Sequence, residues 1–174
     1  MSAESLFGMA LWEARDRLQA QLDEGARCPC CEQYARRYRR KVNSAMARWL
    51  IALARIHEES EQSWVHVAAI AAVVAGRSVR RALELRAGPI GTGDYAKTRH
   101  WGLAISQPNE DPAKRDSGFW QLTARGSAFV GDRIEVPCYA VIYDNELQRL
   151  EGGSVSIRDA LGRRFNYQEL MLGL

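Results

Sequence analysis

The spacing of apolar residues along the first 100 positions follows the period of a helix. Apolar side chains recur at three- and four-residue steps, which places them on one face of an amphipathic helix. The pattern predicts a first helix over residues 5–25 and a second, stronger one over residues 33–58. Three shorter helices are expected over residues 64–74, 77–87 and 95–101.

After residue 101 the pattern changes to a period of two, which is typical of strands. Short strands are expected at residues 103–105 and 119–122, joined by a polar loop over 106–117. Further along the chain we expect a helical turn at 123–130, a strand at 136–143 that turns at 144–146 and pairs back through 147–150, and helices at 156–161 and 167–172.

The order helix, helix, short helix, strand, loop, strand is that of a winged helix-turn-helix. Residues 94–105 (DYAKTRHWGLAI) look like a recognition helix that runs into the first wing strand. Residues 119–129 (FWQLTARGSAF) look like the second wing strand followed by a Leu-Thr-x-x-Gly element. This region resembles the wing of MarR-type and PadR-type transcriptional regulators. The whole chain, with Cys-Pro-Cys-Cys at 28–31, also looks like uncharacterised proteins of bacteriophages and prophages.

These elements predict a mainly α chain with a small β component (α+β). The expected architecture is a winged helix-turn-helix with an N-terminal helical extension and a C-terminal β-rich segment. Residues 1–32 would form the helix and cysteine turn, residues 33–135 the winged core, and residues 136–174 a β-hairpin with short helices. Three tryptophans are expected in the core rather than at a ligand: Trp49, Trp101 and Trp120.

Composition agrees with a globular protein. Of the 174 residues, 47% are hydrophobic and 26% charged, which excludes a disordered or collagen-like chain. No apolar run approaches the roughly 18 residues of a membrane span, and the N-terminus lacks the basic region of a secretory signal. We therefore expect a cytoplasmic protein, here of a bacterial host cell, with no membrane partner.

The net charge of +3 conceals two basic segments. Residues 27–55 contain eight basic residues and one acid, and residues 76–103 contain six basic residues and two acids. Clustered Lys and Arg side chains are typical of proteins that bind polyanions, although a solvated helix face has the same appearance.

If the winged-helix resemblance holds, it implies contacts with double-stranded DNA. Outward-facing side chains of the helix at 94–101 would meet base edges in the major groove, the wing tip would contact phosphates or the minor groove, and the second helix would add phosphate contacts. The candidate DNA-binding residues are Lys97, Arg99 and His100 on the helix, Lys114 and Arg115 at the wing tip, and Arg36, Arg37 and Arg40 on the second helix.

The cysteine cluster has three interpretations. Cys28 and Cys31 have the spacing of a zinc knuckle, and Cys30 or Cys138, or two cysteines of a second copy, could complete a structural zinc site. Alternatively, a Cys-Pro-x-Cys motif before a helix is a redox motif. The simplest interpretation is a tight turn whose small thiols pack between two helices.

No P-loop, G-x-S-x-G or H-E-x-x-H pattern is present in the sequence, so no enzyme is expected. The sequence thus favours a DNA-binding phage or prophage regulator, or a DNA-associated protein, that acts as a homodimer. The alternative is a phage interaction module that uses a winged-helix scaffold to bind a host protein.

Overall fold

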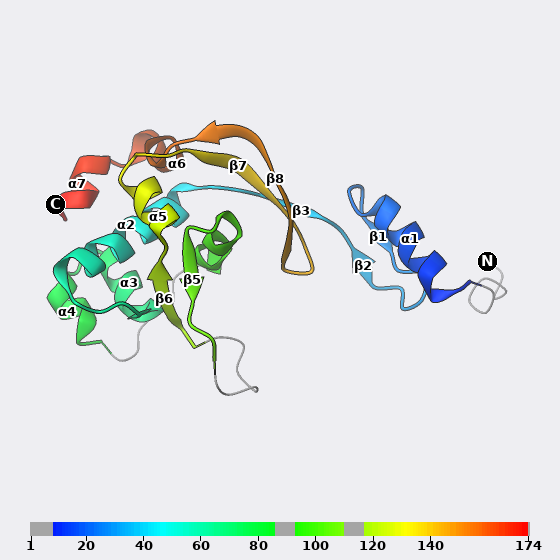
Figure 1. The fold of residues 1–174 in the computed structure, drawn as a ribbon, viewed down its shortest axis with the longest axis horizontal. Coiled ribbons are helices and arrows are strands. Elements are labelled where there is room, and N and C mark those ends of the chain that lie inside the picture. The colour runs from blue at the N-terminus through cyan, green and yellow to red at the C-terminus, as the bar shows by residue number, and fades with distance from the viewer. Residues whose placement is uncertain (1–8, 86–92, 110–116, 174) are drawn as a thin grey trace. The chain divides into compact units, whose positions relative to one another are not determined.

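The computed structural model describes residues 9–85, 93–109 and 117–173, and these residues form two compact units. The N-terminal unit comprises the described residues up to Arg40 together with Ala140–Leu150. The main unit comprises Lys41–Tyr139 and the described residues from Glu151 onward. Figure 1 labels the helices and strands of both units.

The N-terminal unit begins with helix α1 (Leu11–Gln21), which packs against a short hairpin. Strand β1 (Ala26–Arg27) pairs antiparallel with β2 (Tyr34–Ala35). The buried Leu22 follows α1, and its carbonyl accepts a hydrogen bond from the backbone N–H of Arg37 at 2.8 Å. These contacts hold the helix and the hairpin together with little apolar burial.

A three-stranded sheet has the order β3 (Tyr38–Lys41), β7 (Val136–Tyr143), β8 (Glu146–Val155). Strands β7 and β8 are joined at Asp144 and Asn145, whose φ angles are 48° and 63°. Two successive residues of positive φ make the type I′ geometry that matches the twist of a tight hairpin, and Asn and Asp tolerate it. The predicted strand and turn at 136–146 are therefore confirmed.

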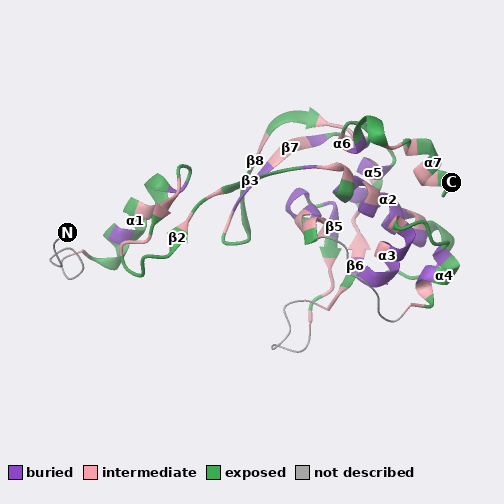
Figure 2. Ribbon diagram, turned by 180° about the vertical axis from the view of Figure 1, so that it is seen from behind, coloured by how far each residue is buried: buried purple, intermediate pink, exposed green. Residues whose placement is uncertain are grey.

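Helix α2 (Ser44–Glu59) is the core of the main unit. Asn43 caps it by accepting a hydrogen bond from the Met46 N–H at 3.0 Å, and its amide nitrogen donates to Asp94 at 3.1 Å. Most of α2 is buried (Figure 2). It packs against α3 (Val67–Val74), α5 (Ala124–Val130), α6 (Ile157–Leu161), α7 (Tyr167–Leu172) and the 3₁₀ helix η2 (Gly93–Trp101).

An aromatic cluster closes this core. Trp49 stacks on Tyr95 with ring centroids 5.2 Å apart, and Trp120 meets both rings edge-on. The Trp101 indole donates to the Pro137 carbonyl at 2.7 Å. All three tryptophans are buried, so their predicted place in the core is confirmed.

A small antiparallel sheet of the main unit has the order β4 (Val65–His66), β6 (Phe119–Leu122), β5 (Ala104–Ser106). Thr123 caps α5 after β6 by accepting a hydrogen bond from the Gly126 N–H at 2.9 Å. A side chain at Gly126 would collide with the Leu103 carbonyl. Glycine is therefore required where α5 approaches the β5 segment.

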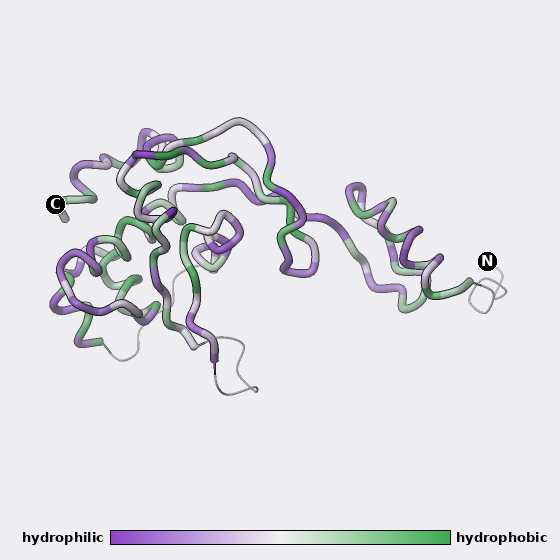
Figure 3. Tube along the Cα trace, in the orientation of Figure 1, coloured by the Kyte–Doolittle hydropathy of each residue, from purple (hydrophilic) through white to green (hydrophobic). Residues whose placement is uncertain are grey.

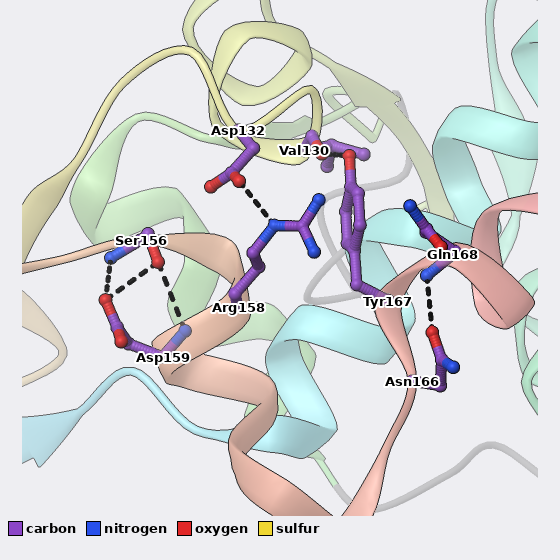
Figure 4. Close-up of polar contacts among 8 residues, drawn as sticks. All are labelled: Val130, Asp132, Ser156, Arg158, Asp159, Asn166, Tyr167 and Gln168. Carbon is purple, nitrogen blue, oxygen red and sulfur yellow. Dashed lines mark hydrogen bonds and ion pairs between the residues drawn. The ribbon is translucent and has the colours of Figure 1, made fainter.

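Polar contacts fix the C-terminal helices (Figure 4). Ser156 and Asp159 form a capping box at the start of α6, and the hydrogen bonds from Ser156 lower the pKa of Asp159. Arg158 bonds Asp132 at 2.6 Å, and the Tyr167 hydroxyl donates to the Val130 carbonyl at 2.7 Å.

The described chain also contains α4 (Val79–Leu83) and the 3₁₀ helix η3 (Gly162–Arg164).

The expected fold class is wrong. The described residues form an α+β structure with three separate small sheets, where a mainly α winged helix-turn-helix was predicted. The segment expected to be the recognition helix is the 3₁₀ helix η2, in which Thr98, His100 and Trp101 are buried. Much of that segment therefore belongs to the core and does not present an α-helical face.

The predicted helix at 33–58 is also wrong in its first third, because residues 34–35 and 38–41 form β2 and β3 and the helix begins only at Ser44. Tyr34, Tyr38 and Val42 have helical spacing, but the strand-forming tyrosines also alternate with arginines at every second position. Asn43 then supplies the cap that starts α2.

Candidate nucleic-acid interface

Residues 36–41, between β2 and the end of β3, contain five basic side chains, of which Arg36, Arg39, Arg40 and Lys41 are exposed. All four residues of β3 are exposed, and its trace is largely hydrophilic (Figure 3). Arg36, which precedes β3, is exposed as well. The sequence placed these bases on a helix; the structure instead displays them on extended backbone.

Part of this segment lines a groove of the N-terminal unit. Gln33, Tyr34, Ala35, Arg36 and Tyr38 all contribute to that groove. The Arg40 guanidinium lies over the Tyr38 ring, 5.5 Å from its centroid. Tyrosines and arginines of this segment therefore give a surface that carries both aromatic rings and positive charge.

The groove has a volume of about 330 Å³. Leu18 of α1 and the thiols of Cys28 and Cys31 contribute to its walls, together with Tyr143 and Asp144 from the tip of the β7–β8 hairpin. Three tyrosines and one arginine thus converge on a single hollow. Asp144 is the one carboxylate among the described residues that line it.

Arg37 differs from its neighbours. It is half-buried, it forms an ion pair with Asp23 at 3.2 Å, and its backbone N–H bonds the Leu22 carbonyl. Arg37 therefore anchors the segment to the end of α1. Of the three arginines predicted to bind DNA here, Arg36 lines the groove and Arg40 lies over the Tyr38 ring.

The bases predicted on the helix at 94–101 lie in the main unit and have different surroundings. Arg99 is exposed and Lys97 is half-buried. His100 is buried, and burial, reinforced by the charges of Arg99 and Lys97, lowers its pKa to about 4. An uncharged, enclosed imidazole is unsuited to contacting a phosphate. Lys114 and Arg115 lie outside the described residues.

The cysteines form a compact turn at the tip of the β1–β2 hairpin. The backbone N–H groups of Cys30 and Cys31 donate to the Cys28 sulfur and lower the pKa of that thiol. The Cys28 N–H bonds the Gln33 carbonyl at 2.8 Å, which closes the loop. Cys138 lies on β7, within the residues of the main unit.

Zinc at these cysteines stays a prediction. Within residues 9–85, 93–109 and 117–173, no group of three or more His, Cys, Asp or Glu side chains is arranged to hold a metal ion. Cys28 and Cys31 would therefore supply only part of a four-ligand site. Metal analysis of protein purified without an affinity tag tests it, and less than about half an equivalent per chain would contradict a structural zinc.

Sequence reasoning missed the tyrosines of the groove. The signal available in the sequence was the clustering of Tyr34, Arg36 and Tyr38 within five residues, although Tyr34 lies in β2, Tyr38 in β3 and Arg36 between the two strands. Tyr143 carried no comparable signal, since it reaches the groove only through a hairpin about 100 residues further along the chain.

Among the described residues, no helix has both the length and the apolar character needed to cross a membrane.

The chain matches no protein-family model, no curated protein and no solved structure. The resemblances to MarR-type and PadR-type regulators and to phage proteins therefore stay predictions, and the candidate interface stands on its own geometry.

Proposed function

We propose that this protein binds nucleic acid through the exposed basic segment at residues 36–41. The observation that carries the proposal is that Arg36 and Tyr38 line the groove of the N-terminal unit while the Arg40 guanidinium lies over the Tyr38 ring. Arginine presents a rigid fork of donors that matches phosphate oxygens, and it remains charged at all physiological pH values.

The sequence favours double-stranded DNA as the ligand and a phage or prophage regulator as the role. Phosphate contacts by a basic segment support DNA binding without requiring a particular fold, because they depend on charge and reach. The contacts predicted for Lys97 and Arg99 belong to the main unit and stay predictions. The regulatory role follows from the resemblance, and DNA binding is its first requirement.

The test measures binding of a fluorescently labelled 20-base-pair duplex and of one of its strands at 50 mM and 200 mM salt. The wild-type protein should bind at least one of them, and more weakly at the higher salt. Changing Arg36 and Arg40 together to alanine should weaken binding about tenfold or more at 50 mM salt, in keeping with lost charge-assisted phosphate contacts.

A matched control removes the same charge elsewhere. Arg80 and Arg81 are exposed on α4, and the double change to alanine at these positions should leave affinity within about threefold. Equal losses in the two double variants would show that net charge alone matters and would overturn the assignment to residues 36–41. Absence of any salt-dependent binding would overturn the function and favour an interaction module for a host protein. Light scattering on the same samples measures the molar mass and so tests the predicted homodimer.

A further inference from the structure

We propose that the tyrosine-lined groove receives unpaired bases, so that the preferred ligand is a single-stranded nucleic acid. This inference rests on the proposed function and names the ligand class of the same site. It starts from the aromatic rings, which phosphate binding alone leaves without a role.

The tyrosine rings are available to a ligand. Tyr34 is 56% exposed and Tyr38 is 50% exposed, although both line the groove. The two tyrosines are four positions apart, so their Cα atoms lie at most about 13 Å from one another, and within this span each ring can meet a base of the same strand. Stacking on aromatic side chains tolerates any base, because every base has a π face.

Tyr34 is held in place before any ligand binds. Its residue pairs with Arg27 across the β1–β2 hairpin, and its hydroxyl packs so closely over Gly25 that a Cβ there would collide with it. Gly25 has a φ of +88°, a conformation that also disfavours other residues. A ring that is already fixed loses little conformational entropy on stacking, which strengthens binding.

Charge is placed beside the rings. Arg36 lines the groove between the two tyrosines in sequence, and Arg40 lies against the Tyr38 ring. A strand whose bases enter the groove therefore passes guanidinium groups that its phosphates can contact. Asp144 offers an acceptor for the exocyclic amino group of a base, the role that carboxylates have toward cytosine.

The size and chemistry of the groove favour unpaired over paired bases. In a duplex each base is stacked on its neighbours, so its π face is closed to protein side chains. A hollow of about 330 Å³ lies at the small end of ligand pockets and suits one or two planar rings. In a double helix, no base face would be open for the tyrosine rings to stack on.

The experiment compares three labelled ligands of one sequence, namely a 15-nucleotide single-stranded DNA, the corresponding single-stranded RNA and the DNA duplex. Wild-type protein should bind at least one single strand about tenfold more tightly than the duplex. The DNA and RNA arms identify which single strand is preferred. Equal or tighter binding of the duplex would overturn the inference.

Variants then test stacking directly. Changing Tyr34 and Tyr38 together to leucine should weaken single-strand binding about tenfold or more, with little effect on the duplex. The double change to phenylalanine keeps the rings and should restore binding to within about threefold of wild type. Trp12, which is 69% exposed on α1 and does not line the groove, provides the control: Trp12→Leu should leave binding unchanged.

A measurement on the wild-type protein covers the case in which the leucine variant fails to fold. A single strand containing 5-iodouracil is irradiated on the protein, and mass spectrometry locates the cross-linked peptide. Cross-links should fall at Tyr34 or Tyr38. Cross-links confined to the main unit would overturn the inference.

The two failures are distinguishable. If the arginine variant weakens binding of all ligands while the tyrosine variant behaves as wild type, nucleic-acid binding by residues 36–41 stands and the base-stacking groove is wrong. If no ligand binds in a salt-dependent manner, the proposed function itself fails and the groove inference fails with it.

Discussion

The two units are stabilised by different kinds of contact. In the main unit the largely buried helix α2 is surrounded by other helices and an aromatic cluster. In the N-terminal unit the buried apolar residues among those described are only Ala14, Leu22, Ala140, Val141 and Ile142. The main unit is therefore stabilised by burial. The N-terminal unit depends on backbone pairing and local contacts, and it leaves most of its arginines exposed, along with Tyr34 and Tyr38.

This difference indicates where ligand binding would matter for stability. A small unit with few buried residues gains a large share of its stability from anything that binds the folded form. The main unit is stabilised by its own buried core and does not depend on a ligand. Changes in the main unit should accordingly act on global unfolding, and changes in the N-terminal unit on local order and on binding.

The largest effect should come from truncating α2. Leu53 is completely buried, so Leu53→Ala should lower the free energy of unfolding by about 3 kcal/mol through lost burial and a cavity. Urea unfolding followed by tryptophan fluorescence measures it. Leu11→Ala, at a position that is 79% exposed on α1, should cost less than about 0.5 kcal/mol. Equal losses of unfolding free energy in Leu53→Ala and Leu11→Ala would contradict this difference between the two units.

Acid should weaken the main unit through His100. Its pKa is lowered from 6.5 to about 4 in the folded protein, so the unfolded chain binds the proton first as pH falls. The stabilisation is complete above about pH 6.5 and is lost progressively down to about pH 4, by up to about 3 kcal/mol. His100→Gln should flatten the dependence of unfolding free energy on pH. Parallel curves for the two proteins would refute this assignment.

A glycine of the N-terminal unit should separate local from global stability. Gly25→Ala forces a strained φ and displaces Tyr34, at a cost of roughly 1–2 kcal/mol. Hydrogen exchange should accelerate in residues 26–35 while the urea midpoint of the main unit stays constant. Gly153→Ala is the control, since a Cβ there meets nothing within 4 Å. A shift of the main transition would show that the units do not unfold separately.

The smallest effect concerns the nature of the charge at the groove. Replacing Arg36 and Arg40 by alanine should reduce the slope of log affinity against log salt by about 2, one for each phosphate contact. Replacement of both by lysine should keep the slope, because the charge remains. If the lysine variant shows the shallow slope of the alanine variant, geometry and not charge governs the contact.

The sequence predicted the second half of the chain better than the first. Residues 136–143 and the following turn were right because strand alternation and turn residues agree there. Residues 33–43 were wrong because two periods coexist: Tyr34, Tyr38 and Val42 have the spacing of a helix face, while tyrosine and arginine alternate with the period of a strand. Pairing of β3 with β7 decides between them, and that partner lies about 100 residues away.

The candidate site was predictable only in part. Clustered arginines identified the basic segment, in which Arg36 lines the groove and Arg40 lies over the Tyr38 ring. His100 was expected on the outward face of an α-helix, yet the tighter turn of a 3₁₀ helix places it in the core with Trp101. The groove itself requires α1, the cysteine turn and a distant hairpin tip together, which no local pattern encodes.

Deamidation of Asn43 would alter the contact between α2 and η2. Its amide oxygen caps α2 while its amide nitrogen bonds Asp94, so each end of one side chain has a separate task. Spontaneous deamidation would convert it to aspartate, which still caps the helix but sets a second carboxylate against Asp94. In a molecule with aspartate at this position, η2 would be repelled from the start of α2, although the mass would differ by only about one dalton.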